Sequence, residues 1–387
     1  MIYDAIVVGA GPAGAVLAYL LANSGLKVLV LEKATLPRYK TCGGGVTYKT
    51  VQSLPVDASS TYEREAIGGI VSYTGKQLLK ANVKGSIGWL VMRDRFDYLL
   101  AQCAVNAGAE LFEGVTVERV EQEADRVKVQ TSKGEFTARF VVGADGVLST
   151  VARLAGLLRQ RQVGVAIEAE IEVPTYSLEA QGPYATFDFG ALPGGYGWIF
   201  PKLDHLSVGV FRALPGKAAG LGSHLDRFIT SHAVLDKGRR RICQGHLIPL
   251  GGRMETLHQG MILLVGDAAN LADPWLGEGL CYAVRSARIA AETIQNALAL
   301  GLTDLSAYTR RVNVEIVQQL SHARRLAGLI YRFPGLGSQL ISKSLRMQEL
   351  VFGNLRGDLT FRQLNRKLFL ETPTIFFQAL SREKGTL

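Results

Sequence analysis

The first thirty residues alternate between apolar runs and a glycine-rich turn. Tyr3–Val8 is a short apolar run, and the sequence GAGPAG follows it at residues 9–14. An alanine- and leucine-rich stretch comes next, Ala15–Ala22, and a second apolar run ends on an acidic residue, Val28–Glu32. A strand, a glycine-rich turn, a helix and a second strand in this order predict a βαβ unit.

The middle of the chain changes to a strand pattern. After an amphipathic helix predicted for Arg93–Ala107, several β-like segments fill Ala109–Val142. Apolar residues alternate strictly along Val163–Val173, with the glutamates of Glu168–Glu172 between them. This alternation predicts an antiparallel strand with water on its acidic face. Three more segments are predicted strands: Tyr184–Phe189, Tyr196–Phe200 and Leu206–Phe211.

The last third of the chain is mainly helical. Met261–Val265 predicts one more buried strand, and Leu280–Leu300 predicts a long helix. Asp304 is placed to cap the next helix, which we expect to end near Phe333. The chain has no internal repeat and no low-complexity linker.

Composition indicates a folded protein of two or three domains. Of the 387 residues, 48% are hydrophobic, which excludes a disordered or collagen-like chain. The net charge is +9, and residues 304–387 hold 13 basic and 6 acidic residues, so the basic excess is concentrated there. The charge-free stretch Ala5–Leu26 is long enough to suggest a membrane span, but its glycines and Pro12 favour the βαβ unit.

The numbers and spacing of the cysteines and histidines bear on metal binding and on disulfides. None of them has metal-ligand spacing, so no metal site is predicted. A chain of this length does not need disulfides, and no secretory signal pattern precedes the first apolar run. We therefore expect a reduced, cytoplasmic protein that is not secreted, and we expect no nucleic-acid partner.

Each glycine of the turn has a structural role in a dinucleotide-binding unit. Gly9 allows the tight turn, Gly11 allows the backbone to approach a pyrophosphate, and Gly14 allows the helix to pack closely on the strand. The helix N-terminus offers free N–H groups to phosphates. Glu32, at the end of the second apolar run, can accept hydrogen bonds from ribose hydroxyls. Together these features predict a dinucleotide site.

Three separated segments together resemble the FAD-binding signatures of the para-hydroxybenzoate hydroxylase-like flavoproteins. The first is residues 9–14 with Glu32, and the second is GADG at residues 143–146. The third is residues 266–279, which begin with Gly-Asp and end with Gly-Glu-Gly. Arg93, at the start of its predicted helix, matches the arginine of that group.

This resemblance implies roles for individual residues. Asp267 would accept a hydrogen bond from a ribityl hydroxyl, and the N–H groups of Gly279 and Leu280 would face the pyrimidine end of the flavin. Asp145 would brace the nucleotide domain. The predicted cofactor-binding residues are Gly9, Gly11, Pro12, Ala13, Gly14, Glu32, Lys33, Arg38, Cys42, Gly43, Gly44, Arg93, Asp145, Asp267, Pro274, Gly277, Gly279 and Leu280.

Two further segments are similar to the geranylgeranyl reductase family. They are PRYKTCGGG at residues 37–45 and YGWIFPK at residues 196–202, which resembles that family's pocket-lining aromatic strand. The resemblance covers about residues 2–300. It implies an FAD-dependent oxidoreductase that saturates isolated double bonds of a geranylgeranyl chain on a diphosphate, a lipid, a chlorophyll precursor or a quinone.

Four residues are the candidates for the chemistry. Strand alternation places Tyr196, Trp198 and Phe200 on one face, where their π faces could stabilise positive charge on the substrate. The Cys42 thiol could relay a proton or pack on the substrate near the flavin. The alternative is that the aromatic residues are ordinary sheet core and that Cys42 is merely small.

The predicted fold is α/β, with a Rossmann-like FAD-binding domain, an inserted antiparallel β-sheet domain for the substrate and a C-terminal helical segment. The FAD-binding domain is predicted for residues 1–45, 91–151 and 261–303. The substrate domain is predicted for residues 46–90 and 152–260. The helical segment is residues 304–387.

The sequence also leads to expectations about the electron donor and about a membrane. Only one dinucleotide fingerprint is present, so the electron donor, NAD(P)H or another reductant, is expected to bind transiently. Apolar residues from Leu350 to Leu359, followed by Arg362, Arg366 and Lys367 and by the apolar residues 368–370, predict peripheral contact with an anionic membrane. Apolar residues also recur near helical spacing between Tyr308 and Tyr331, beside arginines. For these residues, packing on the body of the protein is the alternative to membrane contact.

Two other functions remain open. One is a flavin monooxygenase or halogenase of the same fold, because an aromatic segment ending in Pro also occurs there. The other is a non-enzymatic protein that carries prenylated proteins. The presence of both Glu32 and Asp267 argues against the second.

Overall fold

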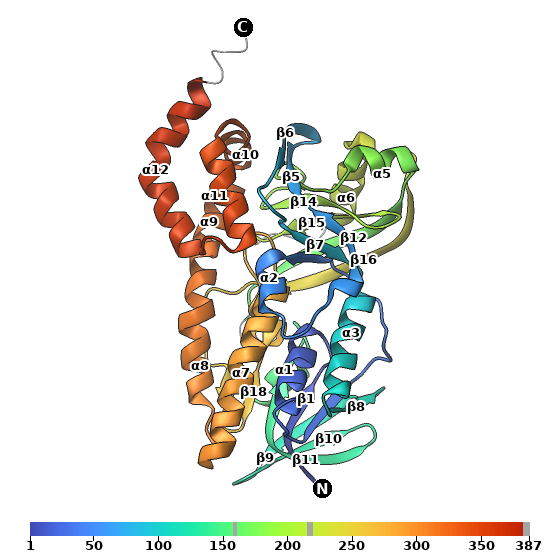
Figure 1. Ribbon diagram of the computed structural model, residues 1–387, viewed down its shortest axis with the longest axis vertical. Helices are drawn as coiled ribbons and strands as arrows, with labels where there is room; N and C mark the ends of the chain where they lie inside the picture. The colour runs from blue at the N-terminus through green and yellow to red at the C-terminus, as the bar shows by residue number, and fades with distance from the viewer. Residues whose placement is uncertain (158–160, 215–219, 382–387) are drawn as a thin grey trace.

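The computed structural model describes residues 1–157, 161–214 and 220–381, with residues 372–381 described by backbone alone. Figure 1 shows two sheets stacked along the long axis of the molecule and a column of helices beside them.

The first sheet is mainly parallel. In spatial order its strands are β17 (His258–Gln259), β18 (Ile262–Leu264), β11 (Gly134–Gly143), β1 (Ile2–Val8), β2 (Val28–Glu32) and β8 (Glu110–Glu113). β9 (Val117–Gln122) and β10 (Val127–Thr131) extend it as antiparallel strands next to β11. Helix α1 (Pro12–Ala22) packs against α3 (Arg93–Asn106) and α7 (Leu280–Leu300), and a short helix, α4 (Thr150–Leu154), follows β11. The predicted βαβ unit and the predicted long helix are confirmed.

The second sheet has seven strands and lies above the first in Figure 1. In order they are β16 (Arg239–Pro249), β12 (Val163–Glu172), β15 (Leu206–Arg212), β14 (Gly195–Pro201), β13 (Tyr184–Asp188), β5 (Gly68–Tyr73) and β6 (Lys76–Asn82). Only β13 and β5 pair in parallel. Two helices pack near it, α5 (Thr175–Gln181) and α6 (Leu221–Thr230), with the 3-10 turn η2 (Ala233–Leu235).

A small third sheet joins the two larger ones. It contains β3 (Gly45–Thr47), β7 (Gly88–Val91) and β4 (Tyr62–Ala66), and it carries α2 (Tyr48–Ser53) and the 3-10 turn η1 (Ser59–Thr61). The predicted domain boundaries near residues 45 and 91 fall at its strands, and the division into domains stays a prediction.

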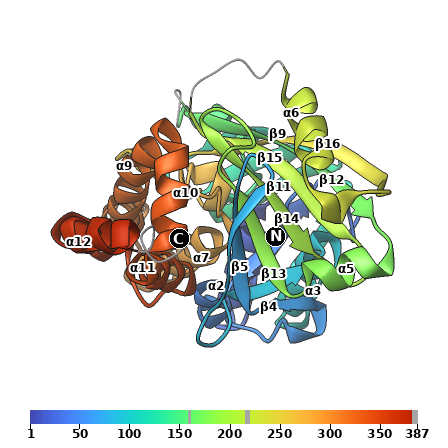
Figure 2. The same ribbon diagram turned by 90° about the horizontal axis from the view of Figure 1, so that it is seen from above.

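The C-terminal helices form the column. They are α8 (Ser306–Val312), α9 (Gln318–Arg332), α10 (Pro334–Lys343), α11 (Leu345–Arg356) and α12 (Phe361–Ser381), with a π-helical turn, η4 (Asn313–Val317), between α8 and α9. Asp304 accepts the backbone N–H of Ser306 at 3.2 Å, but Leu305 is the N-cap residue of α8 and makes no side-chain cap, so the predicted cap by Asp304 is wrong. Seen from above, α9 to α12 stand along the side of the second sheet next to β5 (Figure 2).

The column is part of the protein core. Val312, Ile316 and Leu320 are buried in the main cluster of the first sheet. Leu350, Val351 and related residues of α11 are buried against the second sheet and the segment that precedes α7. The prediction that the apolar cluster 350–359 contacts a membrane is therefore wrong, because protein already covers these side chains.

The prediction that the acidic face of β12 lies in water is also wrong. Glu168 and Glu170 are buried. This part of the sheet faces the loop after β2, where Lys40 contacts His246 at 2.7 Å and Thr41 donates to Gln244 at 3.1 Å. Strand alternation predicted which residues share a face, but the loop that covers that face comes from a distant part of the chain.

Candidate active site

One cavity of about 550 Å³ connects the first sheet to the second. The glycine-rich turn and Glu32 lie at one end, and three aromatic side chains of β14 lie at the other. The loop 40–45 and the segment 276–280 line the part between them. The predicted site residues therefore come together, with two exceptions: Gly14 and Pro274 do not line the cavity.

The glycine-rich turn forms an open cradle. Gly9 has φ +103°, and a Cβ there would lie 2.5 Å from the Ala144 carbonyl oxygen. A Cβ on Gly14 would lie 1.9 Å from the Gly9 carbonyl oxygen, so Gly14 allows close packing behind the cavity. At Gly11, in contrast, the nearest atom is Arg38 Nη2 at 3.9 Å. No side chain caps α1, so its first N–H groups remain for an anionic ligand.

Glu32 holds this turn in place. Its Oε2 accepts the N–H of Ala10 at 2.8 Å, and its Oε1 accepts the N–H of Ala34 at 3.0 Å. A carboxylate oxygen accepts more than one bond, so ribose hydroxyls can still be bound. Asp145 accepts the N–H of Thr150 at 2.6 Å and so braces α4.

A pair of arginines shares one buried carboxylate. Arg93 donates to Asp97 through Nε at 2.7 Å and through Nη2 at 2.9 Å, and Arg38 Nη1 donates to the same carboxylate at 3.1 Å. Burial alone would lower the pKa of Arg93, but the Asp97 charge raises it above its ordinary value. Both arginine side chains line the cavity.

The opposite side of the cavity has a second free helix end. Gly279 precedes α7, and no side chain caps this helix. A Cβ on Gly279 would lie 3.1 Å from Asp267 Oδ1, so a side chain there would press on the carboxylate. The Ser286 hydroxyl accepts the N–H of Gly266 at 3.0 Å and fixes the turn that carries Asp267.

Pro274 lies outside the cavity because its neighbours turn the chain inward. The Asp273 carboxylate accepts the N–H of Trp275 at 2.8 Å and that of Leu276 at 3.2 Å. This turn buries Pro274 and brings Leu276 to the cavity instead. The expected contact of Pro274 with the cofactor is therefore not found in the geometry.

The aromatic wall has the predicted arrangement. The ring centroid of Trp198 lies 6.2 Å from that of Tyr196 and 6.3 Å from that of Phe200. The Tyr196 hydroxyl donates to the Leu276 carbonyl at 2.7 Å. The wall also packs into the core shared with the C-terminal helices, so the residues that line the cavity are also core residues.

The loop with Cys42 lies directly on this wall. A Cβ on Gly43 would lie 2.9 Å from the Phe200 ring and 3.0 Å from Trp198 Nε1, so only glycine fits there without movement. The buried Lys202 ammonium donates to the carbonyls of Gly43 at 2.8 Å and Val91 at 2.7 Å. Lys202 thereby fixes the loop, a role that the sequence did not indicate.

Comparison with known proteins identifies the group to which these features belong. The FAD binding domain family matches residues 2–188. Digeranylgeranylglycerophospholipid reductase 1 of Methanopyrus kandleri is 31% identical over 346 residues, which cover 85% of this chain and 91% of that protein. The chain belongs to the geranylgeranyl reductase family of FAD-dependent oxidoreductases.

Solved structures agree with this family fold. A geranylgeranyl bacteriochlorophyll reductase-like protein of Thermoplasma acidophilum has a TM-score of 0.80 at 24% identity, over 95% of this chain and 98% of that one. The flavin-dependent brominase Bmp2 has a TM-score of 0.74 at 20% identity, with both chains fully covered. At these identities the likeness shows the fold alone.

In this member of the geranylgeranyl reductase family, two titratable residues that the sequence did not indicate also lie at the cavity. Glu168 and His246 line it. Burial, followed by repulsion from Glu170, raises the pKa of Glu168 from 4.5 to about 7. Burial and the charges of Lys40 and Arg93 lower the pKa of His246 to about 4. His246 is therefore a neutral partner of Lys40, whereas Glu168 can hold a proton near neutral pH.

Proposed function

We propose that this protein uses FAD to saturate isolated double bonds of a geranylgeranyl chain. The observation that carries the proposal is the continuity of one cavity from the glycine-rich cradle to the aromatic wall. A flavin bound in the cradle would place its reactive ring next to a chain that lies on the wall. The name of the Methanopyrus relative makes a digeranylgeranyl glycerophospholipid the first substrate to test, before a free diphosphate, a chlorophyll precursor or a quinone.

The residues that line the cavity suit FAD in their chemistry. We propose that the turn from Gly9 to Ala13 and the free end of α1 bind the diphosphate, and that Glu32 binds the adenosine ribose. Lys33 and Arg38 add positive charge at this end. Asp267 would accept a ribityl hydroxyl, and the N–H groups of Gly279 and Leu280 would bind the pyrimidine end.

Bound and reduced FAD supplies a hydride, and the protein has to supply everything else. An isolated double bond is a poor hydride acceptor, so a proton must be added to one of its carbons. The cation that results on the other carbon would be stabilised by the π faces of Tyr196, Trp198 and Phe200. We propose that the Cys42 thiol packs against the reacting part of the chain, because it lies between the cradle and the wall.

The electron donor is proposed to be NAD(P)H or another reductant that binds transiently. The sequence contains one dinucleotide fingerprint, and we assign it to FAD. A donor without its own domain would reduce the flavin and leave before the isoprenoid substrate binds.

A second function deserves a test because a brominase shares the fold. A halogenase or monooxygenase would use oxygen to react with the reduced flavin and would give an oxygenated or halogenated product. The buried carboxyl at the cavity favours the reductase, because saturation of a double bond needs a proton donor. The non-enzymatic carrier remains the least favoured function, since the whole FAD cradle is intact.

Peripheral contact with an anionic membrane is proposed for a smaller surface than the sequence indicated. No helix within residues 1–157, 161–214 and 220–381 is long and apolar enough to cross a bilayer. On α12, however, Phe369 is 83% exposed and Leu370 is 62% exposed, next to Arg366 and Lys367. The exposed Leu345 belongs to the same region, because its neighbour Arg346 pairs with Glu371 at 2.6 Å.

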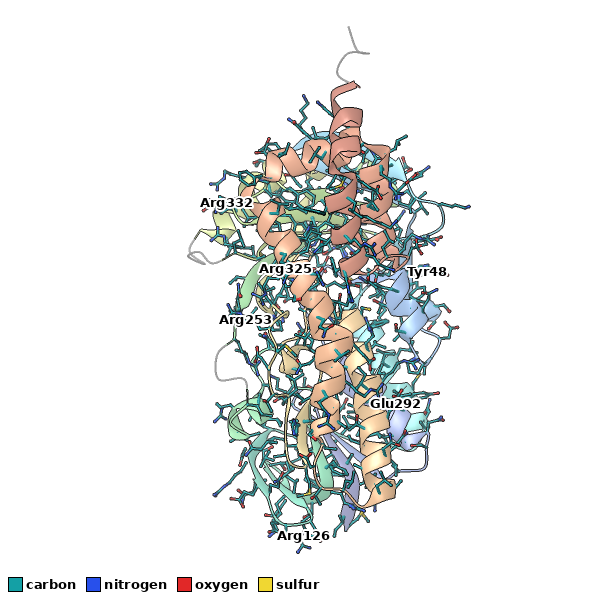
Figure 3. All side chains as sticks on the ribbon, turned by 90° about the vertical axis from the view of Figure 1, so that its left-hand side faces the viewer. Tyr48, Arg126, Arg253, Glu292, Arg325 and Arg332 are labelled. Carbon is teal, nitrogen blue, oxygen red and sulfur yellow. The ribbon has the colours of Figure 1, made fainter. Side chains whose placement is uncertain are left out.

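We call these five residues, Leu345, Arg366, Lys367, Phe369 and Leu370, the apolar–basic surface. Apolar side chains beside basic ones suit an anionic lipid surface. Further exposed arginines, Arg325 and Arg332, lie on the helical column (Figure 3). A lipid substrate could then pass from the bilayer towards the cavity, whose wall includes Leu355 of α11.

The proposed function is tested without oxygen. The bound FAD is reduced with dithionite, the excess reductant is removed, and a geranylgeranyl lipid or geranylgeranyl diphosphate is added. We expect the absorbance of oxidised flavin to return at a rate that depends on the concentration of the isoprenoid. No return of absorbance with any isoprenoid, together with rapid reoxidation by oxygen and an oxygenated product, would favour the second function.

A further inference from the structure

A buried carboxylic acid stands in the same row of the sheet as the central aromatic residue of the wall. Gly209 of β15 pairs with Glu168 of β12 on one side and with Trp198 of β14 on the other. A Cβ on Gly209 would lie 2.2 Å from Trp198 Cζ2. The missing side chain therefore lets the indole extend across β15 on the face that Glu168 also occupies.

One oxygen of this carboxyl group has no partner. Glu168 Oε1 accepts the Ser207 hydroxyl at 2.7 Å, while Oε2 is buried without a hydrogen bond. The residue is only 1% exposed and lines the cavity. A buried polar atom that stays unpaired is rare and points to a function, and this oxygen, when protonated, has an O–H donor without an acceptor.

Charged and titratable groups surround Glu168 from every element packed on it. Glu170 lies on the same strand, and its charge adds to burial in raising the pKa of Glu168 to about 7. The hydrogen bond from Ser207 and the charge of Lys202, which follows β14, act in the opposite direction. Tyr39 has a buried hydroxyl, and burial, followed by the charges of Glu168 and Glu170, raises its pKa.

The group on the neighbouring edge strand, β16, does not compete for this role. His246 lines the same cavity and holds the Lys40 ammonium at 2.7 Å. Its lowered pKa, caused first by burial, leaves it without a proton to donate at neutral pH. Glu168 combines a place on the cavity wall with a pKa raised to about 7, so it can release its proton near neutral pH.

A chain of titratable groups leads from solvent to this point. The Asp204 side chain is 61% exposed and contacts His205 Nδ1 at 2.7 Å. His205 Nε2 contacts Glu170 Oε2 at 3.0 Å, and both residues are buried. Burial would lower the pKa of His205, but its bonds to Glu170 and Asp204 raise it. The imidazole can therefore take a proton from the exposed side and release one inside.

We propose that Glu168 is the proton donor of the reduction and that Asp204, His205 and Glu170 return a proton to it from solvent. The inference rests on the proposed function. The O–H bond of Glu168 breaks while the electron pair of the double bond forms a C–H bond. The other carbon would accept the hydride that reduced FAD supplies when bound, which would leave the FAD oxidised. The Glu168 carboxylate then regains its proton from Glu170, which lies two residues further along the same strand.

Two variants and one control test the donor and the return path separately. Glu168→Gln keeps the size of the side chain and its bond to Ser207 but has no acidic proton. We expect unchanged FAD content and isoprenoid binding, and prenyl-driven flavin reoxidation slowed by about 100-fold or more. His205→Gln should leave the first turnover intact and slow the following ones. Glu172 lies on the same strand and pairs with Arg239 at the surface. Glu172→Gln should therefore change neither the rate of the first turnover nor that of the following ones.

Two measurements distinguish the loss of a proton donor from a merely structural effect of the Glu168→Gln substitution. The wild-type rate should fall as the pH rises through about 7, because the donor loses its proton there. The Glu168→Gln variant should lose this pH dependence. The infrared difference between wild type and this variant, recorded on the FAD-bound protein without isoprenoid, should show a protonated carboxyl band that disappears over the same range.

The outcomes decide between the inference and the function on which it rests. A wild type that turns over while Glu168→Gln keeps its rate and its pH profile overturns the inference alone. An absent carboxyl band at pH 6 also overturns it. A wild type that never oxidises its flavin with an isoprenoid overturns the proposed function, and the inference with it.

Discussion

Replacing Glu168 with glutamine should stabilise the protein at alkaline pH relative to the wild type. On folding, burial and the charge of Glu170 raise the pKa of this carboxyl from 4.5 to about 7. Between these two values the folded protein keeps the proton that the unfolded chain has lost. The contribution of Glu168 to stability is therefore fully present below pH 4.5 and is lost as the pH rises through about 7.

The magnitude follows from the same two values. At about 1.36 kcal/mol for each pH unit, the wild type should lose about 2–3 kcal/mol of unfolding free energy relative to Glu168→Gln between pH 5 and pH 8. Urea unfolding of both FAD-bound proteins at several pH values measures this difference, and the Glu172→Gln variant serves as the surface control. If the unfolding free energies of wild type and Glu168→Gln change equally with pH, the Glu168 carboxyl is not desolvated, which would contradict its burial in the structure.

Three further predictions concern the cofactor, the loop and the membrane. Asp267→Ala should lose a hydrogen bond to FAD worth about 1.5–3 kcal/mol, and flavin titration should show binding weakened by about 10- to 100-fold; unchanged affinity would leave Asp267 as a turn residue only. Cys42→Ala should retain FAD and slow prenyl-driven reoxidation at every pH, without the altered pH profile expected for Glu168→Gln; an unchanged single-turnover rate would remove the thiol from the reaction. Reversing the charges of Arg362, Arg366 and Lys367 should abolish salt-sensitive sedimentation with anionic vesicles, whereas equal sedimentation of the wild type with neutral and anionic vesicles would contradict the electrostatic part of the membrane proposal.

Local patterns predicted much of the fold. The glycine-rich turn, its flanking strands and α7 are specified by residues that are neighbours in the sequence, and the structure confirms them. The alternation of Tyr196, Trp198 and Phe200 likewise fixes which face they share. Glu32, Gly279, Leu280 and residues 9 and 11–13 of the glycine-rich turn line one cavity, at the end of a strand or at the start of a helix.

Long-range packing explains what the sequence could not predict. Alternation along β12 separates two faces but does not say which one water reaches, and the loop 37–45 covers the face with Glu168. An amphipathic pattern in α11 is equally compatible with a membrane and with a protein core. The packing of Phe352 and Leu355 near Ala66 and Ile87 decides for the core.

In the proposed reaction, the electron pair of the flavin hydride ends in a new C–H bond of the saturated isoprenoid. The most direct measurement reduces a known amount of bound FAD without oxygen, adds a geranylgeranyl lipid, and determines both the oxidised flavin and the mass of the product. We expect one flavin oxidised for each double bond saturated, with two hydrogens added to the lipid. Oxidised flavin with an unchanged lipid, or a lipid that gains oxygen only when air is admitted, would contradict it.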